Sequence, residues 1–123
     1  MIGIGVDVTT ISRIEKSLGR PQFAERVFTL EERELLNKKS APAQTAAANF
    51  AAKEAFGKAL GTGLSGFSWQ ELSVLRDKNG APYFAYTGAL LNKMEQHGWR
   101  ALVSLTHEGD AAAAFVILEE GKP

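Results

Sequence analysis

An alanine-rich stretch from about Ala43 to Leu60 places the strongest constraint on how this chain can fold. Alanine has the highest intrinsic helix propensity, and its small side chain lets another element pack closely against the helix. Gly61, Thr62 and Gly63 follow directly and supply the glycine that commonly ends a helix. The sequence therefore predicts one long helix around which the rest of the chain is organised.

Two charged residues near the end of this helix, Glu54 and Lys58, are four residues apart and lie on the same face. On a helical wheel Glu54 is flanked by small and apolar residues, namely Ala47, Phe50, Ala51 and Gly57. One interpretation is a surface ion pair that stabilises the helix by a few tenths of a kcal/mol. The other is a functional site, and the spacing alone does not choose between them.

The N-terminal segment, residues 1–8, alternates strictly and predicts a strand. One face carries Ile2, Ile4, Val6 and Val8, and the other carries Gly3, Gly5 and Asp7. Because glycine weakens a strand, these glycines indicate that something packs or binds close to the backbone. Asp7 projects from this cleared face. It is not needed to cap the next helix, because Thr9 and Thr10 can do so.

The remaining chain predicts further short elements. We expect helices at residues 11–18, from residue 21, at 29–39 and at 87–96, and strands at 69–76, 82–86, 99–107 and 111–118. Asn79 and Gly80 form the tight hairpin signal between the first two of these strands. Helices interspersed with hairpins predict an α+β fold, with a mainly antiparallel sheet packed against the long helix. No long linker or repeat divides residues 1–123, so we expect a single domain.

Composition narrows the classes of function. The chain has 123 residues with 14 basic and 14 acidic side chains, which argues against broad nucleic-acid or membrane-surface binding. It has no cysteine, so disulfides, a thiol nucleophile and a zinc–thiolate site are excluded. No signal peptide or long apolar segment is present, and we expect a cytoplasmic protein. A domain of this size rarely contains a deep pocket of its own, which favours a site shared between subunits.

Positive charge gathers near the first predicted helix, at Arg13, Lys16, Arg20 and Arg26. Most such clusters are simply solvated. In a protein with a formal net charge of zero, the alternative is a surface that binds an acidic partner.

Asp7 and Glu54 are carboxylates on different elements, and both face small residues. Mg²⁺ prefers a few protein carboxylates and completes its coordination with water and substrate phosphates. Lys58 could contact the same phosphates. The three residues are candidates for a metal-dependent phosphoryl-group site, although the sequence cannot show that Asp7 and Glu54 meet. The glycines at positions 61 and 63 follow a helix, whereas a phosphate loop precedes one, so we expect them to end the helix.

The two histidines carry weaker signals. Ser104, His107 and Asp110 could form a nucleophilic triad, but residues at this spacing along a strand rarely do, and no nucleophile-elbow motif surrounds Ser104. His97 lies near the end of a predicted helix, where a capping or dipole role is favoured over catalysis.

Several segments occur together and in order: GIGVDV at 3–8, Arg13, FAERVFT at 23–29, FAAKEAFGKALGTG at 50–63, NGAP at 79–82 and SLTHE at 104–108. Over nearly the whole chain they resemble the holo-[acyl-carrier-protein] synthase family of small 4′-phosphopantetheinyl transferases. The resemblance implies the 4′-phosphopantetheinyl transferase fold. It also implies transfer of 4′-phosphopantetheine from coenzyme A to a serine of apo-acyl carrier protein in fatty-acid biosynthesis, with release of adenosine 3′,5′-bisphosphate.

The same resemblance assigns roles to residues. It implies Mg²⁺ bound by Asp7 and Glu54, and Lys58 in contact with the coenzyme A phosphates. The other residues expected at the coenzyme A site are Gly61, Asn79, Gly80, Pro82, Thr106 and His107. Docking of the acidic carrier protein is expected at Arg13 and Arg20, with Arg26 as a weaker candidate. The family typically forms a homotrimer with active sites at subunit interfaces.

The chain departs from the family pattern at Asn49, where many members carry an arginine, and this removes one possible phosphate contact. Position 107 is not always histidine in the family, which leaves the need for His107 open. Two alternatives remain: a noncatalytic module that binds coenzyme A or a nucleotide, and a transferase that serves polyketide or peptide synthase carriers. Retention of both carboxylates argues against the passive module.

Overall fold

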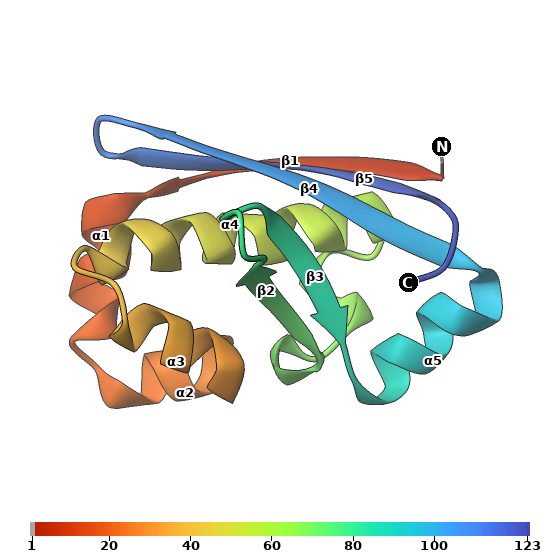
Figure 1. Cartoon of the computed structure of the whole chain (residues 1–123), viewed down its shortest axis with the longest axis horizontal. Coiled ribbons are helices and arrows are strands. Elements are labelled where there is room, and N and C mark those ends of the chain that lie inside the picture. The colour runs from red at the N-terminus through yellow and green to blue at the C-terminus, as the bar shows by residue number, and fades with distance from the viewer. Residues whose placement is uncertain (1) are drawn as a thin grey trace.

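Helix α4 (Pro42–Leu60) lies along one face of a three-stranded antiparallel sheet (Figure 1). The computed structural model describes residues 2–123, without the side chains of residues 64 and 65. The sheet has the order β1-β5-β4, formed by β1 (Gly3–Thr10), β5 (Ala111–Glu120) and β4 (Trp99–Glu108). On the other side of α4 lies the hairpin of β2 (Leu72–Arg76) and β3 (Pro82–Tyr86).

Short helices complete the fold: α1 (Ile11–Leu18), α2 (Pro21–Val27), α3 (Leu30–Asn37) and α5 (Gly88–His97), with two 3₁₀ turns, η1 (Gly63–Gly66) and η2 (Trp69–Glu71). The predicted α+β fold, with its mainly antiparallel sheet against one long helix, is confirmed. Within the described residues, no helix is long and apolar enough to cross a lipid bilayer.

The two glycines of β1 let the strand lie directly on α4. A Cβ atom at Gly3 would overlap the carbonyl oxygen of Ala59, and one at Gly5 would overlap that of Ala55. The prediction that something packs close to this backbone is therefore confirmed, and the packed element is α4. Alanine on the helix and glycine on the strand together leave no side chain larger than a methyl group between the two backbones at these points.

The N-terminus of α1 is capped from the far end of the chain. The Asp110 carboxylate accepts hydrogen bonds from the Ser12 backbone N–H at 2.9 Å and from the Ser12 hydroxyl at 2.5 Å. Thr10 occupies the N-cap position without a side-chain cap, and the Thr9 hydroxyl donates to Asp7 instead. The expectation that one of these threonines caps α1 is wrong, because the β4–β5 turn brings a stronger acceptor to the same N–H group.

Other boundaries differ by a few residues. The strand predicted at 69–76 begins only at Leu72, because the preceding residues form the turn η2. Thr87 does not cap α5; the Glu71 carboxylate accepts from the Ala89 backbone N–H at 2.7 Å. Helix α3 begins with a capping box, in which Thr29 and Glu32 are bonded reciprocally.

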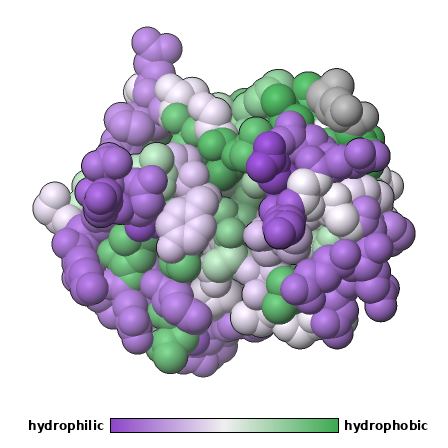
Figure 2. Space-filling model, turned by 45° about the vertical axis from the view of Figure 1, so that its right-hand side comes forward, coloured by the Kyte–Doolittle hydropathy of each residue, from purple (hydrophilic) through white to green (hydrophobic). Residues whose placement is uncertain are grey.

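The outer face of the sheet, away from α4, is apolar and exposed. Its large exposed side chains are Ile2, Ile4, Val6, Val8, Leu102 and Phe115, each between 42% and 66% exposed. Figure 2 shows hydrophobic surface along the upper part of the molecule, the side on which the sheet lies in Figure 1. A contiguous apolar face of this kind is typical of a surface that another protein covers.

We expect Gly5→Ala to destabilise the protein by about 1–3 kcal/mol or more, since overpacking usually costs that much. The added methyl group would lie about 2.8 Å from the Ala55 carbonyl carbon, so β1 and α4 would have to separate. Chemical denaturation at fixed protein concentration measures the change. Gly19→Ala is the control, because Gly19 has an ordinary helical φ of −67°. A Gly5→Ala variant as stable as the wild type would contradict the close packing.

Candidate active site

A cavity of about 370 Å³ lies between β1, α1 and α4, and Asp7 and Glu54 both line it. Strand alternation turns Asp7 to the same side as Gly3 and Gly5, toward α4. The close approach of β1 and α4 then brings it near Glu54. The structure thus shows that the two carboxylates line the same cavity, which the sequence could not establish. Arg13 of α1 lines the same cavity.

Lys58 pairs with Asp7 across the β1–α4 contact. Its Nζ atom lies 3.1 Å from Asp7 Oδ1 and donates to the Val6 carbonyl oxygen at 2.9 Å. Lys58 is about half exposed, whereas the Asp7 side chain is only 14% exposed. The interpretation of Lys58 as one half of an isolated Glu54–Lys58 surface pair therefore fails, because its ion pair links the helix to the strand.

Nearby positive charge compensates Glu54 only in part. Partial burial raises the pKa of its carboxyl group, and the neighbouring Asp7 carboxylate raises it further. Lys58 and Arg13 oppose this rise but do not cancel it. A site in which two carboxylates repel each other binds a proton or a cation more readily than either carboxylate alone.

These residues fit a hard divalent cation. In the part of the chain that the structure describes, no group of three or more histidine, aspartate or glutamate side chains could hold a metal. Asp7 and Glu54 would therefore be the only carboxylate ligands, and the other positions would fall to water and substrate oxygens. This is the pattern that Mg²⁺ prefers.

A second cavity, of about 260 Å³, contains four of the residues expected at the coenzyme A site: Gly80, Pro82, Thr106 and His107. Asn79 lies next to it in the exposed β2–β3 turn. Gly61 lines neither cavity. It ends α4 with a φ of 81°, in agreement with its expected role as a helix stop.

The two cavities lie at opposite edges of the sheet. Asp7 belongs to β1 and His107 to β4, and β5 runs between these two edge strands. Helix α4 contributes Glu54 to the first cavity and Ala48 to the second. Within one chain, the carboxylates expected to bind metal therefore lie with Lys58, away from the other residues expected at the coenzyme A site that line the second cavity.

The arginines predicted for carrier docking divide between two places. Arg13 lines the cavity of Asp7 and Glu54. Arg20 and Arg26 border a smaller hollow of about 180 Å³, with Gln22 and Phe23 between them in the chain. Together they form a basic margin beside the carboxylate cavity.

The Ser104–His107–Asp110 triad is not formed. Positions 104 and 107 point to opposite faces of β4, and Asp110 is bonded to Ser12. His97 stacks on Trp99, with ring centroids 4.2 Å apart, at the end of α5.

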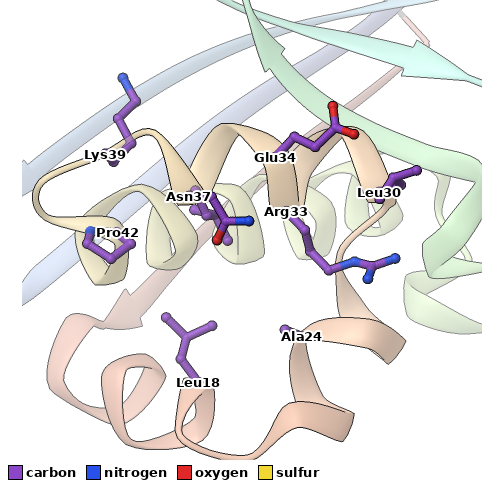
Figure 3. A pocket seen from close by; sticks show the side chains of 9 residues that line it. Leu18, Ala24, Leu30, Arg33, Glu34, Asn37, Lys39 and Pro42 are labelled. Atoms are coloured by element: carbon purple, nitrogen blue, oxygen red, sulfur yellow. The ribbon is translucent and has the colours of Figure 1, made fainter.

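Another cavity, of about 520 Å³, contains none of the predicted site residues (Figure 3). It lies between α3 and the α1–α2 segment and is lined by Leu18, Ala24, Leu30, Arg33, Glu34, Leu36, Asn37, Lys39 and Pro42. Glu34 points away from its interior in this view.

Sequence reasoning missed a buried polar cluster beneath the second cavity. Lys53 and Glu32 form an ion pair at 2.5 Å, and both side chains are fully buried. Burial raises the pKa of Glu32 and lowers that of Lys53, and each residue opposes the shift of the other. The available signal was that Lys53 shares a helical stripe with Ala46 and Phe56, an apolar stripe on which an unpaired charge is not tolerated.

Comparisons with known proteins identify the family. A model of the 4′-phosphopantetheinyl transferase superfamily matches residues 3–116. Holo-[acyl-carrier-protein] synthase of Treponema denticola is 44% identical over 121 residues, covering 97% of this chain and 98% of the relative. The Myxococcus xanthus protein of the same name is 46% identical over 120 residues, covering 95% of this chain and 94% of the relative.

Solved structures are similar along the whole chain. The holo-[acyl-carrier-protein] synthase of Neisseria meningitidis is 39% identical, with a TM-score of 0.88, covering 98% of this chain and 100% of that one. The Bacillus anthracis enzyme, in complex with CoA (3′,5′-ADP), is 33% identical with a TM-score of 0.81, covering 98% and 97%. The chain therefore belongs to the holo-[acyl-carrier-protein] synthase family of the 4′-phosphopantetheinyl transferase superfamily.

Proposed function

We propose that this protein is a holo-[acyl-carrier-protein] synthase, formed by one phosphopantetheinyl transferase domain over residues 1–123. It transfers 4′-phosphopantetheine from coenzyme A to a serine of apo-acyl carrier protein and releases adenosine 3′,5′-bisphosphate, in fatty-acid biosynthesis. The observation that carries the proposal is the cavity shared by Asp7 and Glu54 in a chain whose relatives bear this name. The proposed substrate is coenzyme A, and a similar protein, the holo-[acyl-carrier-protein] synthase of Helicobacter pylori, has been solved in complex with coenzyme A. A cytoplasmic location accords with these substrates.

In the proposed reaction the carrier serine oxygen attacks the β-phosphorus of coenzyme A. A new P–O bond forms, and the bond from that phosphorus to the bridging oxygen breaks, so adenosine 3′,5′-bisphosphate leaves. Negative charge grows on its 5′-phosphate. Lys58 and Arg13 lie beside the carboxylate cavity and offset this charge. Mg²⁺, when bound by Asp7 and Glu54, supplies further positive charge at the same place.

The proton of the carrier serine needs an acceptor. Asp7 already accepts hydrogen bonds from Lys58 and Thr9. Glu54 has a pKa raised by burial and by Asp7, so its proton affinity is higher than that of an ordinary carboxylate. Glu54 is therefore the better candidate for the base among this chain's own residues.

The active enzyme is proposed to be a homotrimer with active sites between subunits. Two observations support this assembly. The cavity of Asp7 and Glu54 and the cavity of His107 lie at opposite edges of one sheet, so a single chain leaves each site incomplete. The exposed apolar face of the sheet also needs a cover, and a second copy of the chain provides one. Carrier protein would dock on the basic margin of Arg13, Arg20 and Arg26.

The direct test mixes the protein with apo-acyl carrier protein, coenzyme A and Mg²⁺, and follows the carrier mass. The wild type is expected to add one phosphopantetheine arm. Asp7→Ala and Glu54→Ala should each lower the rate by about a thousandfold or more, because losing a metal carboxylate removes several kcal/mol of transition-state stabilisation. Glu34→Ala, an exposed change on α3, is the matched control. Near-normal turnover by either site variant would refute the metal assignment, and carriers from peptide or polyketide synthases would reveal a broader substrate range.

Binding of Mg²⁺ should weaken as the pH falls. Protons compete with the metal for Glu54, and the raised pKa extends this competition to a pH above the usual carboxylate range. Calorimetric titration of Mg²⁺ at several pH values measures the effect. Glu54→Gln should bind Mg²⁺ weakly and lose most of the pH dependence in that range. Wild-type affinity that stays constant down to the ordinary glutamate pKa would contradict the shared-carboxylate site.

Phe115→Asp should convert the trimer to a monomer and abolish transfer. Phe115 is 42% exposed and lies beside Val6 at the centre of the outer face, where a buried, unpaired carboxylate would oppose association. Analytical ultracentrifugation gives the oligomeric state. Leu30→Asp is the control, because Leu30 is equally apolar and 58% exposed but lies on α3, away from the sheet. A trimeric Phe115→Asp variant would place the interface elsewhere.

A further inference from the structure

Arg76, at the end of β2, lines the cavity that also contains Pro82 and His107. Its guanidinium group is partly buried, and it donates to Asn49 Oδ1 at 2.8 Å and to the Leu75 carbonyl oxygen at 3.3 Å. Among the described residues, the ion pairs do not include one between Arg76 and a carboxylate. A partly desolvated cation therefore lies at the cavity wall, and the carboxylate that acts on it, the buried Glu32, is already paired with Lys53.

Asn49 holds this guanidinium in place. Its side chain is fully buried, and its amide nitrogen donates to Glu32 Oε2 at 3.0 Å and to the Val74 carbonyl oxygen at 2.9 Å. With both amide hydrogens engaged by acceptors, the amide oxygen must point toward Arg76. Asn49 does not reach the cavity surface. It therefore acts on a ligand through the arginine.

The orientation of Asn49 depends in turn on Glu32. One oxygen of Glu32 accepts from Lys53 Nζ at 2.5 Å and from the Thr29 backbone N–H at 3.0 Å, and the other accepts from Asn49. The charges of Glu32 and Lys53 offset each other in the core. The positive charge of Arg76 is therefore the net charge of this cluster, and its guanidinium group lies at the cavity wall. Such a fixed guanidinium, with donors still free, suits a phosphate group.

The chemistry of coenzyme A identifies which phosphate. Coenzyme A carries a pyrophosphate and, separately, a phosphate on the ribose 3′-oxygen. In the proposed function Asp7, Glu54 and Lys58 bind the pyrophosphate, and their cavity is at the other edge of the sheet. We infer that Arg76, positioned by Asn49, binds the 3′-phosphate of coenzyme A, in an active site whose carboxylates come from the neighbouring subunit. This inference rests on the proposed function and trimer.

The expectation from sequence was that Asn49 simply removes a phosphate contact. In the structure Asn49 instead connects the buried Glu32–Lys53 pair to a cation at the cavity wall. Arg76 is then a binding residue for the substrate, and Asn49 is a positioning residue that acts through it.

The test compares coenzyme A with 3′-dephospho-coenzyme A, which lacks only the phosphate in question. Dissociation constants are measured by calorimetry for the wild type, Arg76→Ala, Arg76→Lys, Asn49→Ala and, as a control that removes a distant charge on α5, Lys93→Ala. Thermal unfolding confirms that each variant is folded, and Arg76→Lys remains informative if Arg76→Ala is not.

The wild type should bind coenzyme A about tenfold or more tightly than the dephospho compound, since a charge-assisted pair is worth about one to two powers of ten in affinity. Arg76→Ala should lose this preference while changing its affinity for the dephospho compound by less than about twofold. Arg76→Lys should keep part of the preference, because lysine retains the positive charge but lacks the planar set of N–H donors of the guanidinium group. Asn49→Ala should reduce the preference in the same direction, and Lys93→Ala should leave it unchanged.

An Arg76→Ala or Arg76→Lys variant with the full wild-type preference would overturn the inference. Equal losses for both ligands would also overturn it, because they indicate a structural role. These results are separable from failure of the proposed function: a wild type that binds coenzyme A with this preference but never modifies a carrier protein would overturn the transferase assignment alone. A wild type that does not bind coenzyme A would overturn both.

Discussion

The contact between β1 and α4 is the constraint on which the rest of the site depends. Glycine on the strand meets the backbone of Ala55 and Ala59 on the helix, so no large side chain separates the two elements. Only at this separation do Asp7 and Glu54 line one cavity while Lys58 reaches the strand backbone. The small residues therefore have a direct functional consequence, because they set the distance between groups that repel each other.

The chain places its charged residues in two different environments. Glu32 and Lys53 are fully buried, and the pair fixes geometry because both groups are satisfied: Glu32 accepts from the Thr29 backbone N–H, and Lys53 donates to the Val27 carbonyl oxygen. Asp7 and Glu54 line an open cavity, where partial burial and the neighbouring Asp7 carboxylate raise the pKa of Glu54. A satisfied buried pair makes the structure rigid, whereas two neighbouring carboxylates at a cavity attract a proton or a cation. The proposed coenzyme A site uses both, since the rigid cluster extends to the second cavity.

The molecule leaves two kinds of surface incomplete. One is the apolar face of the sheet, and the other is the pair of half-sites at its two edges. Association of identical subunits through the apolar face would bring the cavity of one subunit next to the other cavity of its neighbour. In this proposal a single physical driving force, burial of apolar surface, assembles the active site. It also explains how a chain of this size can act on a substrate as long as coenzyme A.

Local patterns in the sequence determined the elements themselves: the alanine run predicts α4, Thr29 and Glu32 cap α3, and alternation sets the two faces of β1. Such signals depend on neighbours within one or two turns of the chain. Together with the family motifs, they also pointed to the site residues. Only the tertiary structure decided which faces meet, because contacts between distant residues leave no periodic trace. It placed Asp110 at the start of α1, paired Lys58 with the strand, and buried Lys53 against Glu32. It also divided the candidate site between two edges of the sheet, because β5 pairs with both β1 and β4 and so lies between them.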